Sequence, residues 1–199
     1  MENILMIHRS EGIVLTTIEV ISECGIQAVS TREVARRQGV SEGAIFKHFR
    51  TKNDLMLGVL NHFSQYDQAI IKSIETKNLS HKEAIIHFFE SYATYYHNYP
   101  AITALELAFD ILQCDMELAE KVKNIFSFRF DFIQHLIIDA QRDGEICPNV
   151  NSDELACVLF GTFREICLKW RMSKYAFSLV EKAKSSFKMV MDAAVTETH

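Results

Sequence analysis

The segment 30–54 constrains the fold of this chain more than any other part of the sequence. Ser30 and Glu33 have the spacing of a capping box, in which the serine hydroxyl accepts a backbone N–H and the carboxylate returns to the serine N–H. Gly39 is placed to end that helix, because glycine adopts the left-handed conformation at low cost. Ser41 is placed to cap the next helix. The segment therefore predicts a helix, a tight turn and a second short helix.

A basic face is predicted on this pair of helices. A further capping box at 51–54 starts a third, longer helix, and Ile45 and Phe49 lie four apart and are expected to face inward. The side chains left pointing outward are Lys47, His48, Arg50 and Lys52. Residues 30–53 hold six Lys or Arg and two acidic residues, whereas the whole chain has a net charge of −5. An acidic protein with one basic face attracts a polyanion through that face, and this arrangement of helices is typical of proteins that enter the major groove of DNA. A basic helical hairpin can also be a solvated surface without a partner.

The sequence around these helices resembles the amino-terminal domain of the TetR family of bacterial transcriptional regulators. The matching positions are Ile18, Gly25, Thr31, Val34, Ala35, Gly39, Val40, Ser41, Gly43, Phe46, His48, Phe49, Lys52 and Leu55. The resemblance implies that the recognition helix spans 41–49 and that the following residues contact DNA: Thr31, Arg32, Ser41, Glu42, Gly43, Ala44, Phe46, Lys47, His48 and Lys52. Phe46 departs from the family, which usually has tyrosine there, and the missing hydroxyl removes a phosphate contact of about 1 kcal/mol.

The rest of the chain is predicted to be helical. Apolar residues recur at helical spacing nearly throughout, and only two prolines and seven glycines interrupt them. We predict an all-α fold of about nine helices, with a three-helix DNA-binding domain over 1–52 and a six-helix regulatory domain over 53–199. The expected helices span 9–24, 30–38, 41–49, 52 into the 70s, 80 to before Pro100, 101–112, 115–142, 151–172 and 175–194. No apolar run reaches the roughly 18 residues of a membrane span, and five scattered cysteines suit a reducing compartment, so we expect a cytoplasmic protein.

Aromatic residues crowd the predicted regulatory domain. Rings at these positions can fill a core or line a small-molecule cavity, and composition does not distinguish the two. The TetR resemblance favours a cavity, since members of the family typically bind a small ligand in the carboxy-terminal helical domain. The candidate ligand-binding residues are Phe88, Tyr92, Phe109, Phe132, His135 and Phe163. The abundance of rings and scarcity of charges indicate a hydrophobic ligand, aromatic or acyl.

Helices 151–172 and 175–194 are the candidates for a dimer interface. Each carries an apolar stripe, the first formed by Leu155, Leu159, Phe163, Ile166 and Trp170, and the second by Phe177, Val180, Ala183, Phe187, Val190 and Met191. These stripes can face their own domain or form a self-complementary surface. A single helix-turn-helix reads too few base pairs to be selective, and two-fold dimers read two half-sites. The resemblance implies a homodimer through these two helices.

These observations predict a homodimeric repressor that binds an inverted-repeat DNA operator and is released by a small hydrophobic effector. The alternative is a sequence-specific or architectural DNA-binding protein without a small-molecule switch. An enzyme is not expected, because no Ser/His/Asp or Cys/His set, phosphate loop or suitably spaced carboxylate pair is evident. No cofactor and no metal site are predicted. His81, His87 and His97 lie at offsets of six and ten rather than four, and His62 and His135 have no identifiable carboxylate partner.

Overall fold

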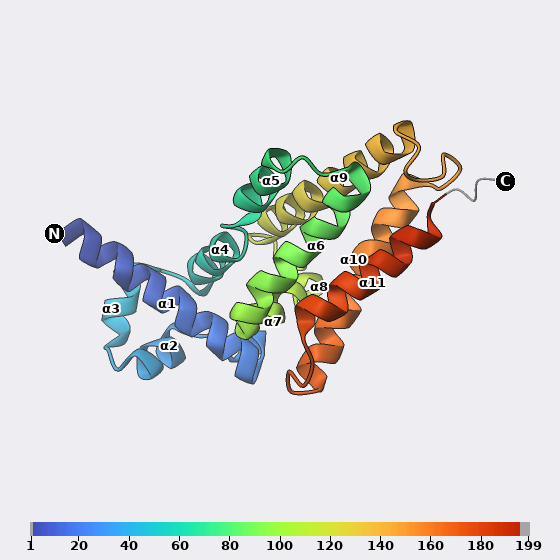
Figure 1. Cartoon of the computed structure of the whole chain (residues 1–199). Helices are drawn as coiled ribbons and strands as arrows, with labels where there is room; N and C mark the ends of the chain where they lie inside the picture. The colour runs from blue at the N-terminus through green and yellow to red at the C-terminus, as the bar shows by residue number, and fades with distance from the viewer. Residues whose placement is uncertain (1, 196–199) are drawn as a thin grey trace. The chain divides into compact units, whose positions relative to one another are not determined.

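A computed structural model describes residues 2–195 of the chain, with side chains from residue 9 onward (Figure 1). The described residues contain helices and turns and no strand, which confirms the predicted all-α fold. The helices are α1 (Glu2–Cys24), α2 (Thr31–Gln38), α3 (Glu42–Phe46), α4 (Lys52–Phe63), α5 (Asp67–Thr76), α6 (His81–Asn98), α7 (Thr103–Glu106), α8 (Phe109–Leu112), α9 (Ala119–Arg142), α10 (Ser152–Met172) and α11 (Leu179–Ala193), with short 3-10 turns η1 (Ile26–Ala28) and η2 (Pro100–Ile102).

The helices pack as two compact units that do not follow the order of the chain. The first unit consists of Met1–Gln65 together with Pro100–Ile125, and the second consists of Tyr66–Tyr99 together with Phe126–His199. Packing of the first unit therefore continues through α4, beyond the predicted boundary at residue 52. That boundary remains a prediction about function.

The first unit is built around α1, which packs against α2, α4 and α7. Its contact with α4 is close at Gly58, where an added Cβ would lie 2.8 Å from the ring of Phe49 and 3.2 Å from a methyl group of Val14. Glycine is therefore required at this position by packing. The buried Phe49 ring in turn fixes the end of the α3 segment against α4.

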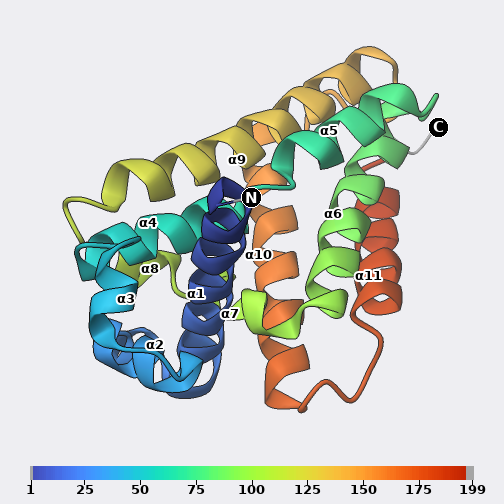
Figure 2. The same cartoon turned by 90° about the vertical axis from the view of Figure 1, so that its left-hand side faces the viewer.

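The second unit has an aromatic core. Helix α6 lies beside α11, as Figures 1 and 2 both show, and α10 packs against α11. The rings of Phe89 and Phe187 stack with their centroids 4.1 Å apart, and Phe163 lies 5.6 Å from Phe89. Large rings therefore join α6, α10 and α11 into one packed core.

Two of the predicted helices are divided in the structure. The helix expected from residue 52 into the 70s ends at Phe63 and restarts as α5 at Asp67. The Ser64 hydroxyl donates to the Leu60 carbonyl 3.1 Å away, a local bond that competes with helix continuation. The helix expected over 101–112 is instead η2, α7 and α8, and the next long helix begins at Ala119 rather than 115.

The predicted dimer stripes are not free surfaces in this structure. All five residues of the α10 stripe are buried, and Ala183, Phe187 and Met191 of the α11 stripe are also buried. Both stripes face the core of their own unit, because α10, α11 and α6 bury them against one another. The stripes expected to bind a second copy are thus core elements. None of the described helices is both long enough and apolar enough to cross a membrane.

Candidate nucleic-acid interface

The start and end of α2 follow the predicted signals only in part. The Ser30 hydroxyl accepts the Glu33 N–H at 3.1 Å, and Gly39 ends the helix in the left-handed region with φ of 64°. The Glu33 carboxylate, however, does not return to Ser30. It accepts from Arg36 at 2.8 Å and from Arg37 at 2.9 Å, because charge-assisted bonds to guanidinium groups are stronger than a bond to a neutral N–H.

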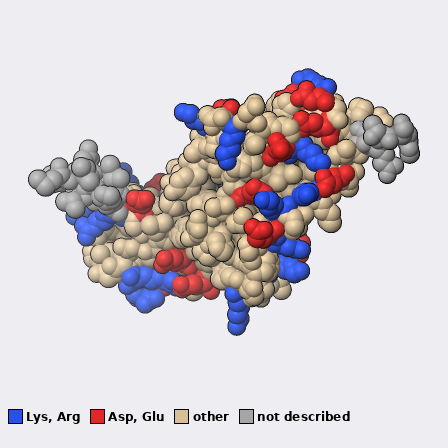
Figure 3. Space-filling model, viewed as in Figure 1, with Lys and Arg blue, Asp and Glu red and all other residues tan. Residues whose placement is uncertain are grey.

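These ion pairs reduce the number of cations that α2 offers to an outside partner. Hydrogen bonds from Arg36 and Arg37 lower the pKa of Glu33 from 4.5 to about 2. Arg37 also donates to Glu23 on α1 at 2.7 Å. Figure 3 shows basic and acidic atoms side by side over the segment where Figure 1 places α2. Arg37 therefore links α2 to α1, and Arg36 is paired within α2, so neither carries unpaired charge.

Helix α3 is shorter than the predicted recognition helix. It spans Glu42–Phe46 and continues as a turn, in which the His48 N–H bonds to the Ile45 carbonyl at 2.9 Å. Ser41 occupies the N-cap position without a side-chain capping bond. Ile45 is fully buried and Phe49 is 8% exposed, so both face inward as the sequence predicts.

The ten residues predicted to contact DNA all reach the surface. Seven are exposed, and Thr31, Ala44 and His48 are half-buried. Phe46 is 44% exposed, so its ring is open to an outside partner. Among residues with described side chains, no acidic group pairs with the exposed cations Arg32, Lys47, Arg50 and Lys52. These four carry the charge that remains available to a polyanion.

Two further contacts define the geometry of this surface. The Thr31 hydroxyl donates to the Glu42 carboxylate at 2.6 Å, which ties the start of α2 to the start of α3. The capping box at 51–54 is complete, with Asp54 N–H on the Thr51 hydroxyl at 2.9 Å and Thr51 N–H on the Asp54 carboxylate at 3.0 Å. Lys52 is therefore held at the rigid first turn of α4, directly beside the end of the α3 segment.

Gly43 is the second residue of α3, and no contact within the chain requires glycine there. A Cβ there would meet only the Ser41 hydroxyl, at an ordinary contact distance of 3.9 Å. Glycine inside a helix costs about 1 kcal/mol relative to alanine. The missing side chain leaves space on the exposed face of α3 for an outside partner to approach.

The predicted ligand-binding residues are divided between the two units. In the second unit, Phe88 lies 4.8 Å from Tyr92 and 5.7 Å from Phe132, measured between ring centroids. Phe163 joins this cluster through Phe89, which lies 5.2 Å from Phe88. Phe109 belongs to the first unit, where its ring lies 5.4 Å from that of Phe63.

His135 is placed apart from the ring cluster. It is exposed, and its Nδ1 lies 2.6 Å from the carbonyl of Asp131 on its own helix. Phe160, which is not among the predicted ligand-binding residues, contacts Phe88, Phe89 and Phe130 and so lies at the centre of the ring cluster. Four of the six predicted residues are thus brought together or linked by shared rings.

A buried ion pair beside the rings was also missed. Arg129 of α9 donates to both carboxylate oxygens of Asp67, at 2.8 and 3.1 Å, and the Tyr92 hydroxyl donates to the same carboxylate at 2.7 Å. The guanidinium carbon lies 4.5 Å from the centre of the Tyr92 ring. Burial lowers the pKa of Arg129, but Tyr92, Tyr96 and Asp67 raise it by more, so the guanidinium stays charged. In the sequence, Arg129 is a charged residue within the apolar face of α9, and this is the signal that could have indicated the buried pair.

Two family models together match almost the whole chain. Residues 13–59 match the family of bacterial regulatory proteins called tetR, and residues 56–193 match the carboxy-terminal region of YsiA-like proteins. The chain therefore belongs to the TetR family of bacterial regulatory proteins. It is a DNA-binding transcriptional regulator and not an enzyme.

Individual relatives and solved structures are similar to this chain over most of its length. The chain is 24% identical to the fatty acid metabolism regulator protein of Bacillus subtilis over 184 residues, covering 90% of this chain and 92% of that protein. The structure of Bacillus subtilis FadR in complex with stearoyl-CoA superposes with a TM-score of 0.78 at 20% identity, covering 91% of this chain and 97% of that one. The ketosteroid regulator KstR2 of Mycobacterium tuberculosis superposes with a TM-score of 0.81 at 13% identity, covering 95% and 96%. At these identities the structural likeness shows the fold alone.

Proposed function

We propose that the protein is a homodimeric repressor that binds an inverted-repeat operator and leaves it when a long-chain acyl-CoA binds the second unit. DNA binding through this surface is supported by one observation: exposed cations on α2, the α3 segment and α4 have no acidic partners among the described side chains. The ligand class is supported by the full-length likeness to a fatty acid regulator and by the fold shared with a protein that holds stearoyl-CoA.

On the operator, the surface divides into positioning and reading groups. Lys52 and His48 are placed for phosphates, and such contacts fix the register of the protein without reading sequence. Gly43, Ala44 and Lys47 are placed for base edges, with Gly43 leaving room for the groove to approach α3. The Thr31 hydroxyl already donates to Glu42, so it contacts a phosphate only after leaving that carboxylate.

An acyl chain suits the ring cluster of Phe88, Tyr92, Phe132 and Phe163. Phe88, Tyr92 and Phe163 are almost fully buried and make ring contacts, so the chain must enter by separating rings that touch. Burial of a long alkyl chain supplies about 0.8 kcal/mol for each methylene, which offsets the cost of that separation. Phe109 and His135 are left outside the proposed ligand contacts.

The ligand signal would pass to the DNA-binding helices through the α5–α4 connection. Asp67 is the first residue of α5, and Arg129 and Tyr92 hold its carboxylate beside the ring cluster. Only residues 64–66 separate α5 from the end of α4, whose first turn carries Lys52. A ligand that moves Tyr92 would therefore shift α5 and pull on α4. Release requires that the ligand binds the displaced arrangement more tightly than the DNA-bound one.

The second copy would bind the outer faces of α10 and α11. Apolar side chains are exposed there on both helices: Val158, Leu168 and Met172 on α10, and Met189 on α11. Gly161, on the same face of α10, has open space where a Cβ would stand, so no contact within the chain requires glycine. An exposed apolar stripe around a mid-helix glycine fits the close approach of a second helix.

Footprinting on the DNA flanking the protein's own gene, over a salt series, tests the DNA-binding part of this proposal. We expect a protected inverted repeat and binding that weakens steeply as salt rises. Thermal unfolding with stearoyl-CoA, and with free coenzyme A as control, tests the ligand class, since a true ligand stabilises the fold by mass action. Specific protection without stabilisation by any acyl-CoA would favour the alternative of a regulator without this switch.

A further inference from the structure

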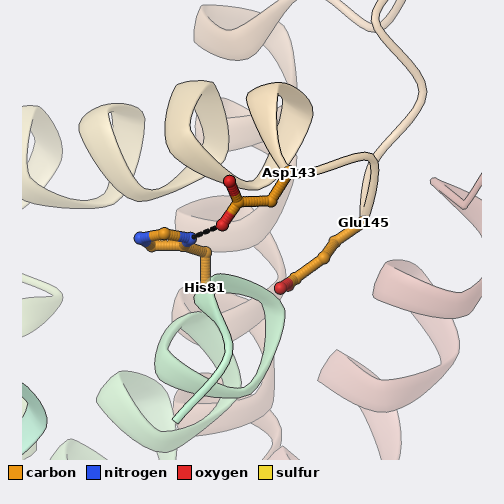
Figure 4. Close-up of side chains that lie close together, drawn as sticks. All are labelled: His81, Asp143 and Glu145. Atoms are coloured by element: carbon orange, nitrogen blue, oxygen red, sulfur yellow. Dashed lines mark hydrogen bonds and ion pairs between the residues drawn. The ribbon is translucent and has the colours of Figure 1, made fainter. Parts of the chain in front are cut away.

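Three possible metal-binding side chains meet where the end of α9 approaches the start of α6. His81 is the first residue of α6, and Asp143 and Glu145 lie just beyond the end of α9. The Nδ1 atom of His81 lies 2.9 Å from a carboxylate oxygen of Asp143, and one possible ligand atom from each residue lies within 4.8 Å of the others. Figure 4 shows the Asp143 carboxylate bonded to the imidazole and the Glu145 carboxylate extending toward the start of α6, both from the turn after α9.

The backbone after α9 explains how two carboxylates reach one histidine. Gly144 takes a φ of 74°, in the left-handed region, and the Glu145 N–H bonds to the Ala140 carbonyl at 2.8 Å. This turn reverses the chain between Asp143 and Glu145, so both side chains face the start of α6. The Glu145 carboxylate is held there by the Lys82 N–H at 2.7 Å. The arrangement is therefore fixed by a helix-ending turn and a capping contact rather than by free side chains.

The charge around the three residues favours a cation. With a neutral imidazole the group carries two negative charges, and the nearby Lys82 ammonium is engaged with Asp192 at 2.8 Å. Carboxylates of Glu83 and Glu145 already bond to N–H groups at the start of α6 and offset its helix dipole. Among the described residues, no hydrogen bond or ion pair involves the second carboxylate oxygen of Asp143 or of Glu145. Each carboxylate thus keeps an oxygen that a metal ion can take.

We propose that His81, Asp143 and Glu145 form a binding site for a divalent transition-metal ion of the zinc type. One imidazole nitrogen and two carboxylate oxygens are a donor set that zinc accepts, at metal–ligand distances of about 2.0 to 2.2 Å. Tetrahedral ligands then lie about 3.4 Å apart. The present separations reach this by small rotations of side chains at the surface, with the imidazole exchanging Asp143 for the ion. The bound ion links the end of α9 to the start of α6, and water completes its coordination.

Isothermal titration of zinc chloride into the full-length, chelator-treated protein tests the site. We expect one saturable site per chain whose affinity falls on the order of tenfold or more in His81→Gln and in Asp143→Asn. Asp153→Asn, which removes an exposed carboxylate at the start of α10, should leave the isotherm unchanged. Absence of a one-per-chain site, or a site that survives both variants, would overturn the proposal.

Thermal unfolding provides a second readout that does not depend on the isotherm. Zinc should raise the melting temperature of the native protein and of Asp153→Asn, because an ion that binds only the folded chain stabilises it. At the same zinc concentration it should raise that of Asp143→Asn much less, because the variant binds zinc more weakly, and the circular dichroism of this variant without metal should match that of the native chain. Equal stabilisation of all variants would place zinc elsewhere and contradict the site.

Discussion

The exposed cations of the predicted DNA-binding surface in the first unit contrast with a buried cation in the second. In the first unit, Arg32, Lys47 and Lys52 are exposed and have no acidic partner among the described side chains. In the second unit, Arg129 is 5% exposed and bound to the equally buried Asp67. The exposed cations are hydrated and can pair with the phosphates of a polyanion. The buried cation is already paired with Asp67 and is not accessible to an outside partner. Residue type alone does not tell these roles apart, but burial and pairing do.

Glycines show the same contrast within the first unit. Gly58 faces Phe49 and Val14 so closely that any side chain would collide with them, whereas Gly43 faces open space. The first glycine serves packing, and we assign the second to an outside surface. The predictions below test whether these distinctions between internal and external roles hold.

The largest expected effect is the loss of stability when the buried ion pair between Asp67 and Arg129 is broken. Asp67→Asn leaves the Arg129 guanidinium charged and buried without its counter-ion, so we expect the free energy of unfolding to fall by about 3–5 kcal/mol. Urea unfolding monitored by circular dichroism measures this change. Asp67→Leu combined with Arg129→Met should recover most of the loss. If Asp67→Asn alone were neutral, the pair would not have the internal role that separates the two units.

Next in size is the effect of Gly58→Ala. The new methyl group would press on the Phe49 ring and on Val14, and overpacking of this kind costs about 1–3 kcal/mol. The midpoint of thermal unfolding should fall. Gly43→Ala is the matched control, since its methyl group meets only ordinary contacts and should leave that midpoint unchanged or raise it. The same control variant should bind the operator more weakly, because its methyl group occupies space that the groove needs.

A smaller effect is expected from single exposed lysines. Lys52→Ala should weaken operator binding and reduce the slope of log affinity against log salt by about 2 for the dimer, because one phosphate contact is lost in each half-site. Fluorescence anisotropy with labelled operator measures both quantities. Lys72→Ala, an exposed lysine on α5 in the second unit, should change neither. Equal losses in the two variants would mean that the cations act only through net charge.

The smallest expected effect is the pH dependence carried by Glu33. Its pKa is lowered from 4.5 to about 2 by Arg36 and Arg37, so the folded state binds protons less readily than the unfolded one. The stability that this carboxylate contributes is complete above pH 4.5 and is lost as the pH falls toward 2. Urea unfolding of the native protein and of Glu33→Gln should therefore differ near neutral pH and converge in acid. A difference that stays constant over this range would rule out the ion pairs.

The parts of the molecule that sequence predicted well depend on neighbours along the chain. Ser30, Gly39 and Thr51 act on residues three to five positions away, so their roles in starting and ending helices could be read directly. The inward direction of Ile45 and Phe49 follows from helical periodicity in the same way. These short-range rules placed the starts of α2, α3 and α4 within a residue or so, although α3 ends earlier than predicted.

The parts that sequence could not predict depend on contacts between distant segments. Asp67 and Arg129 are 62 positions apart, as are His81 and Asp143, and no periodicity joins such pairs. Glu33 is a local exception, since Arg36 and Arg37, three and four residues away, compete with the Ser30 N–H for its carboxylate. The apolar stripes of α10 and α11 were visible, but periodicity does not say whether an apolar face meets its own core or a second copy.

The most direct test of the account is operator binding measured against a long-chain acyl-CoA. Labelled operator DNA would be titrated with the full-length protein in the absence and in the presence of saturating stearoyl-CoA, with free coenzyme A as control. We expect stearoyl-CoA to weaken binding by about 5- to 150-fold, the range of ordinary coupling between two sites, and free coenzyme A to have no effect. Specific operator binding that stearoyl-CoA leaves unchanged would contradict the proposed link between the ring cluster and the DNA-binding helices.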